Sequence, residues 1–94
     1  MDVNYGSFVW NVEKERLNIA KHGVDFATAS KAFLDPKREI FVNVRHSETE
    51  ERFFCIGDVE GKVLTVRFVY RGEKIRIFGA GYWREGRKYY EKRE

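Results

Sequence analysis

The sequence contains a single cysteine, Cys55, and a single proline, Pro36. One cysteine cannot form an internal disulfide, and because Cys55 lies in an apolar run we expect a buried thiol and not a nucleophile. The longest apolar runs are interrupted by polar or charged residues and fall short of the roughly 20 residues that a membrane helix needs. The first residues also lack the basic and apolar segments of a secretory signal. These absences favour a cytoplasmic protein without a membrane span.

Residues that would hold a metal or a cofactor are also scarce. The two histidines, His22 and His46, are far apart and form no His-x-x-x-His pair, so we expect no metal site. There is no glycine-rich phosphate loop, nucleotide-binding fingerprint or Ser-His-Asp set, so we expect no cofactor. His22 ends a predicted helix, where a capping role is favoured over catalysis.

The charge is distributed unevenly along the chain. Its 94 residues, 43% of them hydrophobic and 16% aromatic, suit one domain over residues 1–94. Residues 1–61 carry 8 Lys and Arg against 11 Asp and Glu, whereas residues 62–94 carry 10 against 4. The C-terminal third is therefore strongly basic, as expected of a surface that meets phosphate or an acidic partner.

The N-terminal third predicts one strand and two helices. The pattern predicts a strand over residues 5–10, and Asn11 and Gly23 mark the two ends of a helix over residues 12–22. Asp25 can cap a second helix that runs through Leu34, and Asp35-Pro36 ends it because the residue before proline avoids helical angles.

After Pro36 the apolar residues alternate, which predicts strands. We expect a strand around Ile40, strands over residues 51–59, 62–71 and 74–81, and a last helix over residues 84–92. The predicted fold class is α+β, in the order β-α-α-β-β-β-β-α, with a mainly antiparallel sheet packed by the two N-terminal helices.

Two-residue turns at 60–61 and 72–73 fix the pairing of the last three strands. The counting pairs Phe54 with Arg67 and Val69 with Arg76. Because side chains alternate across a sheet, one face collects basic and aromatic residues, with Glu50 at its rim near Arg71. The members of this basic face are Arg52, Phe54, Ile56, Thr65, Arg67, Val69, Arg71, Lys74, Arg76 and Phe78. Such a face is either an ordinary solvated surface or a surface for phosphate contacts and base stacking on RNA.

Several spaced motifs between about Phe8 and Tyr90 resemble the BrnT-type toxin family. They are Trp10-Asn11, Lys21-His22-Gly23-Val24, Phe26 with Ala29, Phe33-Leu34-Asp35-Pro36, Arg45-His46-Ser47, Glu50-Glu51-Arg52, Ile56-Gly57, Arg71 and Ile75-Arg76-Ile77. The resemblance implies a RelE-like fold and a toxin that cleaves RNA and arrests growth. It also implies an antitoxin with a ribbon-helix-helix part, through which alone the complex binds operator DNA.

The sequence departs from the family's common pattern at two places. Trp10-Asn11 stands where Trp-Asp is common, and Gly79-Ala80-Gly81 stands where Ser-Ala-Arg is common. The second departure removes a guanidinium from the side of the fold that the resemblance implies is active. Either Arg84 or Arg87 supplies that charge, or this branch cleaves weakly or acts mainly as a binding partner.

The functional hypothesis is metal-independent RNA cleavage on the basic face. Arg67, Arg76 and Arg52 would bind the scissile phosphate, because guanidinium donors match phosphate geometry. Glu50 or His46 would transfer the proton, and Trp10 or Phe54 would stack on a base, while Arg71, Lys74 and Arg84 would bind RNA. The alternative is a non-catalytic module that binds an acidic antitoxin or RNA. A sequence-specific DNA binder is disfavoured because no helix-turn-helix is visible.

Overall fold

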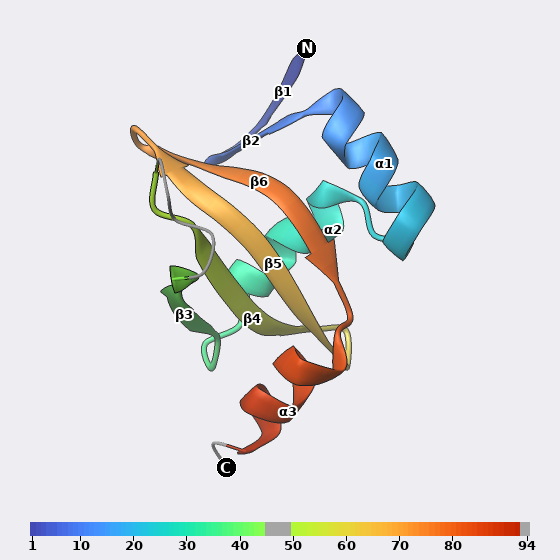
Figure 1. Cartoon of the computed structure of the whole chain (residues 1–94), viewed down its shortest axis with the longest axis vertical. Coiled ribbons are helices and arrows are strands. Elements are labelled where there is room, and N and C mark those ends of the chain that lie inside the picture. Colours follow the sequence, from blue (N-terminus) through green and yellow to red (C-terminus); the bar gives the residue numbers. More distant parts are fainter. Residues whose placement is uncertain (45–49, 93–94) are drawn as a thin grey trace.

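The computed structural model describes residues 1–44 and 50–92. Six strands form one sheet in the order β1-β2-β6-β5-β4-β3, and helices lie on both of its faces (Figure 1). The elements are β1 (Asp2–Tyr5), β2 (Phe8–Asn11), α1 (Val12–His22), α2 (Phe26–Ser30), the 3-10 helix η1 (Lys31–Leu34), β3 (Glu39–Val42), β4 (Phe53–Val59), β5 (Lys62–Arg71), β6 (Lys74–Gly81) and α3 (Arg84–Lys92).

The α+β class and the element order are confirmed, but the prediction for the sheet was wrong in one respect. The sheet is mixed, because β2 pairs in parallel with β6 through Phe8 with Ile75 and Val9 with Arg76. The predicted first strand is a hairpin of β1 and β2, with Gly6 at its turn in a left-handed conformation. The parallel pair joins segments more than sixty residues apart, which local sequence patterns do not report.

The prediction that two N-terminal helices cover the sheet was also wrong. Only α2 and η1 lie over the core face, where Phe26, Ala29 and Ala32 pack against buried sheet residues. Those sheet residues include Cys55, Leu64, Val66, Phe68 and Ile77. On the opposite face α3 packs against Ile56 and Thr65, so α2 lies behind the sheet and α3 in front of it in Figure 1.

The first helix lies along the edge of β6. Its predicted bounds and caps are confirmed: the Lys14 amide donates to Asn11 Oδ1, and Gly23 has φ 71°. The buried residue of α1 is polar: Asn18 donates through Nδ2 to the carbonyls of Val24 and Ala80 and accepts from the Ala80 amide. Asn18 thereby occupies the hydrogen-bonding edge of β6 beyond its short pairing with β2.

The predicted register is confirmed for the hairpin with the turn at 60–61, and for the hairpin with the turn at 72–73 as far as Phe68. Phe54 pairs with Arg67 and Val69 with Arg76, as the two-residue turns require. A bulge between Arg67 and Phe68 places Arg67 opposite Gly79 and Phe68 opposite Ile77, so Phe78 is the extra residue of β6. As the extra residue, Phe78 has its ring beside the guanidinium groups of Arg52 and Arg67 on the basic face.

Cys55 lies in the core with no exposed surface, as predicted. Burial raises the pKa of its thiol to about 12, so the thiolate required of a nucleophile is not formed near neutral pH. Among the helices of residues 1–44 and 50–92, none combines the length and the apolar character needed to cross a membrane.

Candidate functional site

Arg67 on β5 is the centre of the site. Its guanidinium carbon lies 5.6 Å from the ring centroid of Phe78 and 5.4 Å from that of Trp83. Gly79 faces it across the strand pair, and a Cβ there would lie 2.6 Å from Arg67 Nη2. The guanidinium therefore lies on bare backbone between two aromatic rings, a position that only glycine at 79 permits.

The charge of Arg67 has no carboxylate partner among the described residues. Its Nε is buried and makes no hydrogen bond within that part of the chain. The Arg52 guanidinium lies 5.0 Å from the same Phe78 ring. Burial lowers the pKa of Arg67, and the charge of Arg52 lowers it further. Two neighbouring guanidinium groups, of which Arg67 has no carboxylate partner in the described part of the chain, form a site suited to an anion.

Helix α1 supplies the other wall of a small cleft over Arg67. Lys14, Lys21 and His22 line this cleft, which has a volume of about 180 Å³ and also touches Leu17, Asn18 and Phe78. The His22 ring meets the Trp83 ring edge to face, with 5.1 Å between the centroids. Burial lowers the pKa of His22, as do the charges of Lys21 and Arg67. His22 is therefore mostly neutral at pH 7 and able to accept a proton.

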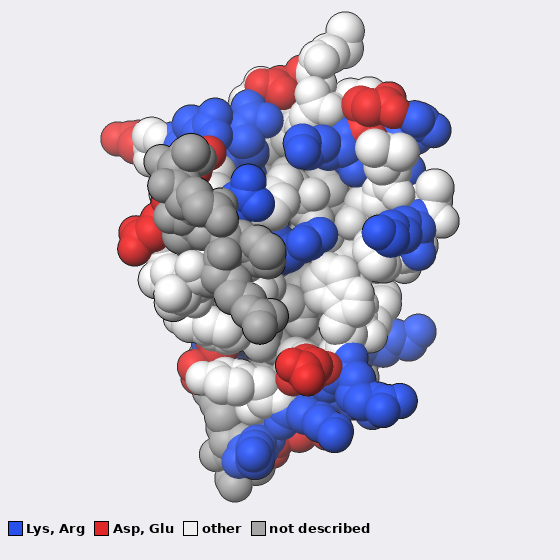
Figure 2. All heavy atoms as spheres, viewed as in Figure 1, with Lys and Arg blue, Asp and Glu red and all other residues white. Residues whose placement is uncertain are grey.

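Figure 2 shows that many Lys and Arg side chains gather on one face of the molecule, and three cations of the basic face have partners. Arg71 Nη2 lies 3.0 Å from Glu50 Oε1, which confirms the predicted proximity of these two residues. Arg76 Nη2 lies 2.6 Å from Asp2 Oδ2, and Lys74 Nζ donates to the Gly6 carbonyl. These contacts weaken the positive charge that each residue presents to a ligand.

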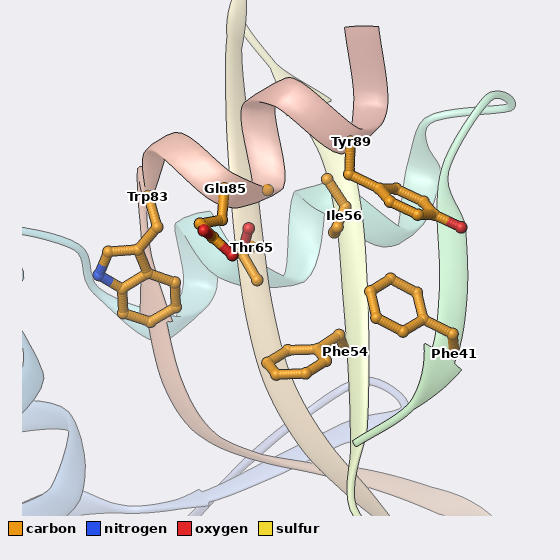
Figure 3. Close-up of a pocket in the computed structure, with 8 residues that line it drawn as sticks. Phe41, Phe54, Ile56, Thr65, Trp83, Glu85 and Tyr89 are labelled. Atoms are coloured by element: carbon orange, nitrogen blue, oxygen red, sulfur yellow. The ribbon is translucent and has the colours of Figure 1, made fainter. Parts of the chain in front are cut away.

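A second depression lies between α3 and the sheet (Figure 3). It has a volume of about 380 Å³ and is mainly apolar. We call it the α3 hollow; its lining residues are Phe41, Phe54, Ile56, Thr65, Trp83, Glu85, Gly86 and Tyr89. Trp83 belongs both to the hollow and to the surroundings of Arg67, so the two sites adjoin.

The sequence over residues 10–86 matches the family described as the ribonuclease toxin BrnT of a type II toxin-antitoxin system. The chain belongs to the BrnT family. No curated protein matches the sequence. Members of this family are described as ribonuclease toxins, so RNA is the substrate class of the family.

The structure brings together only part of the site that the sequence predicts for this BrnT protein. Arg67 and Arg52 share one ring, and Phe54 is half-buried in the neighbouring hollow. Arg84 lies apart, in a groove with Lys62, Arg87 and Glu91. His46 lies outside the described residues.

Trp10 cannot take the predicted stacking role on RNA. It is 3% exposed, its ring packs against Tyr5 and Phe26, and its Nε1 donates to Glu15. The reason is that β2 lies inside the sheet, between β1 and β6, and the side chain of Trp10 is on the face of β2 that packs into the core.

Gly81, which is predicted from the sequence to depart from the family's common pattern, lies against Trp83. A Cβ on Gly81 would lie 2.6 Å from Trp83 Cε2, so the indole ring lies directly over that glycine. The Trp83 ring thus fills the space beside Gly81 and also contacts the guanidinium of Arg67.

The sequence pattern did not indicate Lys14, Lys21 and Trp83 as site residues, and His22 was predicted to cap a helix. Lys14, Asn18 and Lys21 recur at helical spacing along one side of α1, which was an available signal. Nothing local indicated that this side faces Arg67, because that depends on how α1 lies along β6.

Proposed function

We propose that this BrnT-family protein is an endoribonuclease that cleaves RNA without a metal ion, in the cleft between α1 and the basic face. The observation that supports this is Arg67: a guanidinium held between Phe78 and Trp83, with no carboxylate partner among the described residues. Donors prepositioned in this way stabilise charge that develops on a phosphate in the transition state.

The reaction is transesterification by the ribose 2′-OH. His22 accepts the 2′-OH proton, the 2′-oxygen attacks phosphorus, and the P–O5′ bond breaks to leave a 2′,3′-cyclic phosphate. Arg67 and Arg52 hold the non-bridging oxygens, and Lys14 and Lys21 add positive charge at the cleft wall. The departing 5′-oxygen takes a proton from water in the open cleft.

We propose His22 as the general base because of its position. It lines the same cleft as Arg67, and its lowered pKa keeps it neutral at pH 7. Glu50 is held by Arg71 at the rim, which makes it the weaker candidate of the two described residues. Exchange to glutamine tests Glu50 and His46 as the base in the same way that it tests His22.

The remaining cations extend the RNA-binding surface beyond the scissile phosphate. Arg71, Lys74 and Arg76 lie on the side of β1, and Arg84 lies on α3. The partly neutralised charges of Arg71, Lys74 and Arg76 suit contacts to flanking phosphates, which position the strand without reading its sequence.

The family's type II class implies an antitoxin partner. We infer a cytoplasmic complex in which an antitoxin with a ribbon-helix-helix part covers the basic surface and carries the contact to operator DNA. An acidic antitoxin segment would match the charge of the C-terminal third.

The test is RNA cleavage by the purified chain, freed of any partner, in EDTA. Wild type is expected to give fragments with 2′,3′-cyclic phosphate ends, and Arg67→Ala to reduce the rate by about 10²–10³-fold. Lys31→Ala is the matched control, because it removes one positive charge from η1 on the opposite side of the sheet and should cleave normally.

Intact RNA at high concentrations of correctly folded wild type would reject the enzyme. If that chain still binds RNA or an acidic partner, the alternative of a non-catalytic module is supported. Equal activity of wild type and Arg67→Ala would show that the reaction takes place elsewhere.

A further inference from the structure

We propose that the α3 hollow binds a guanine base of the RNA and gives the cleavage its sequence preference. The inference rests on the proposed function, because the base belongs to the strand whose phosphate lies at Arg67. It concerns a different site, however, whose ligand can be tested without cleavage.

The walls of the α3 hollow suit a flat aromatic ligand. Phe54 and Phe41 rise from the sheet with ring centroids 5.3 Å apart, and Tyr89 of α3 lies 5.2 Å from Phe41. Trp83 closes the other end (Figure 3). The volume of about 380 Å³ falls within the range of roughly 300–1,000 Å³ that small-molecule sites show. Unstacked bases of single-stranded RNA are held by such rings.

The height of the hollow is set by Gly86. Its backbone lies directly over Thr65 Oγ1, so a side chain at 86 would collide with the sheet and lift α3. The Tyr90 hydroxyl donates to Asp35 Oδ2 and ties the far end of α3 to the loop before β3. The hollow is therefore a fixed feature of the fold, held at both ends of the helix.

One carboxylate lies among these rings. Glu85 extends from α3 toward Thr65 and the sheet, and has no ion pair or hydrogen bond within the described residues (Figure 3). A carboxylate accepts hydrogen bonds only, so its partner must present donors. Guanine offers two adjacent donors, N1–H and the N2 amino group, on its Watson–Crick edge. Adenine and cytosine place a ring acceptor beside their amino group, and uracil has a single N–H between two carbonyls.

The α3 hollow lies next to Arg67, and this connects it to the proposed reaction. Phe54 is the cross-strand partner of Arg67, and Trp83 contacts the Arg67 guanidinium. A nucleotide whose base enters the hollow therefore has its phosphate on the side of Arg67. The preferred cleavage site should accordingly lie next to a guanosine.

Glu85 also distinguishes a base from an apolar side chain of a protein. An apolar side chain filling the hollow would remove water from this carboxylate without offering a donor, which is costly. An acidic segment, attracted by the surrounding Lys88 and Lys92, would be repelled by Glu85 within the hollow itself.

The test is a titration of ¹⁵N-labelled protein, followed by NMR, with GMP, inosine monophosphate, AMP and ribose 5-phosphate. GMP should shift the Trp83 indole N–H and the amides of Ile56 and Tyr89, while the buried Trp10 indole stays in place. Inosine monophosphate lacks the N2 amino group and should bind about tenfold more weakly than GMP. Ribose 5-phosphate reports any shift caused by phosphate at Arg67 alone.

Glu85→Gln should weaken GMP binding about tenfold, because the amide no longer supplies two charged acceptors. The affinities for GMP and for inosine monophosphate should then be nearly equal. Glu91→Gln, the same exchange on α3 outside the hollow, should leave both affinities unchanged. Equal binding of GMP and AMP, or unchanged selectivity in Glu85→Gln, overturns the assignment to guanine.

Parallel cleavage assays in EDTA separate this inference from the proposed function. A protein that cleaves RNA yet shows no nucleotide shift in the hollow keeps the function and loses the base site. A protein that shows the GMP response but leaves RNA intact keeps the base site and loses the enzymatic role.

Discussion

The side-chain amide of Asn18 pairs with both backbone groups of Ala80, donating to its carbonyl over 3.0 Å and accepting from its amide over 3.1 Å. In this way a helix residue takes the place of a neighbouring strand at the edge of β6. The contact sets the position of α1, and with it the position of Lys14, Lys21 and His22 relative to Arg67.

Asn18→Ala is expected to lower the free energy of unfolding by about 2–4 kcal/mol, because it leaves buried backbone groups of Val24 and Ala80 without partners. Urea unfolding followed by circular dichroism measures this. Asn4→Ala on the exposed strand β1 is the control and should cost little. A loss as small as that of the control would show that water satisfies the edge of β6.

Arg67→Met should separate stability from activity. The substitution removes a half-buried charge that has no carboxylate partner among the described residues, and its thioether can still pack between Phe78 and Trp83. We therefore expect the urea midpoint to stay level or rise, while RNA cleavage falls by about 10²–10³-fold. A large drop in the midpoint would assign Arg67 mainly to the stability of the fold.

The pH dependence should carry the signature of His22. Because its pKa is lowered from 6.5 in the folded chain, its contribution to stability is present above pH 6.5 and is lost as the pH falls through the folded pKa. The rate of RNA cleavage should rise over the same acidic range, as the imidazole becomes neutral, and then level off.

Profiles of wild type and His22→Gln between about pH 5 and pH 8 check this. His22→Gln should cleave slowly and lose the acidic rise, whereas His46→Gln, which changes the second of the chain's two histidines, should keep it. If His46→Gln loses the acidic rise and His22→Gln keeps it, the base is His46.

Gly79→Ala is expected to act on the guanidinium and not on the fold. The new Cβ would lie 2.6 Å from Arg67 Nη2, the mobile end of a long side chain, which can move aside at little cost in stability. Cleavage should fall at least tenfold at a nearly unchanged thermal midpoint, because small displacements of a catalytic group are costly. Undiminished cleavage would show that the present position of Arg67 is not required.

The short-range sequence signals were sufficient to predict much of the local structure of this chain. The caps Asn11 and Gly23 fixed both ends of α1, and Asp25 fixed the start of α2. Two-residue turns fixed the register that pairs Phe54 with Arg67, and the apolar surroundings of Cys55 indicated its burial. These features depend on neighbours within a few residues or across one tight turn, so the order of the residues is sufficient to predict them.

The tertiary structure decided which of these pieces form a site. The parallel pairing of β2 with β6 buried Trp10, Asn18 placed α1 beside Arg67, and Gly86 allowed α3 to settle on the basic face. Each of these contacts joins segments far apart in the chain, and its stability depends on burying two complementary surfaces at once. No single segment carries that information, so the cleft at Arg67 and the α3 hollow became visible only in the folded chain.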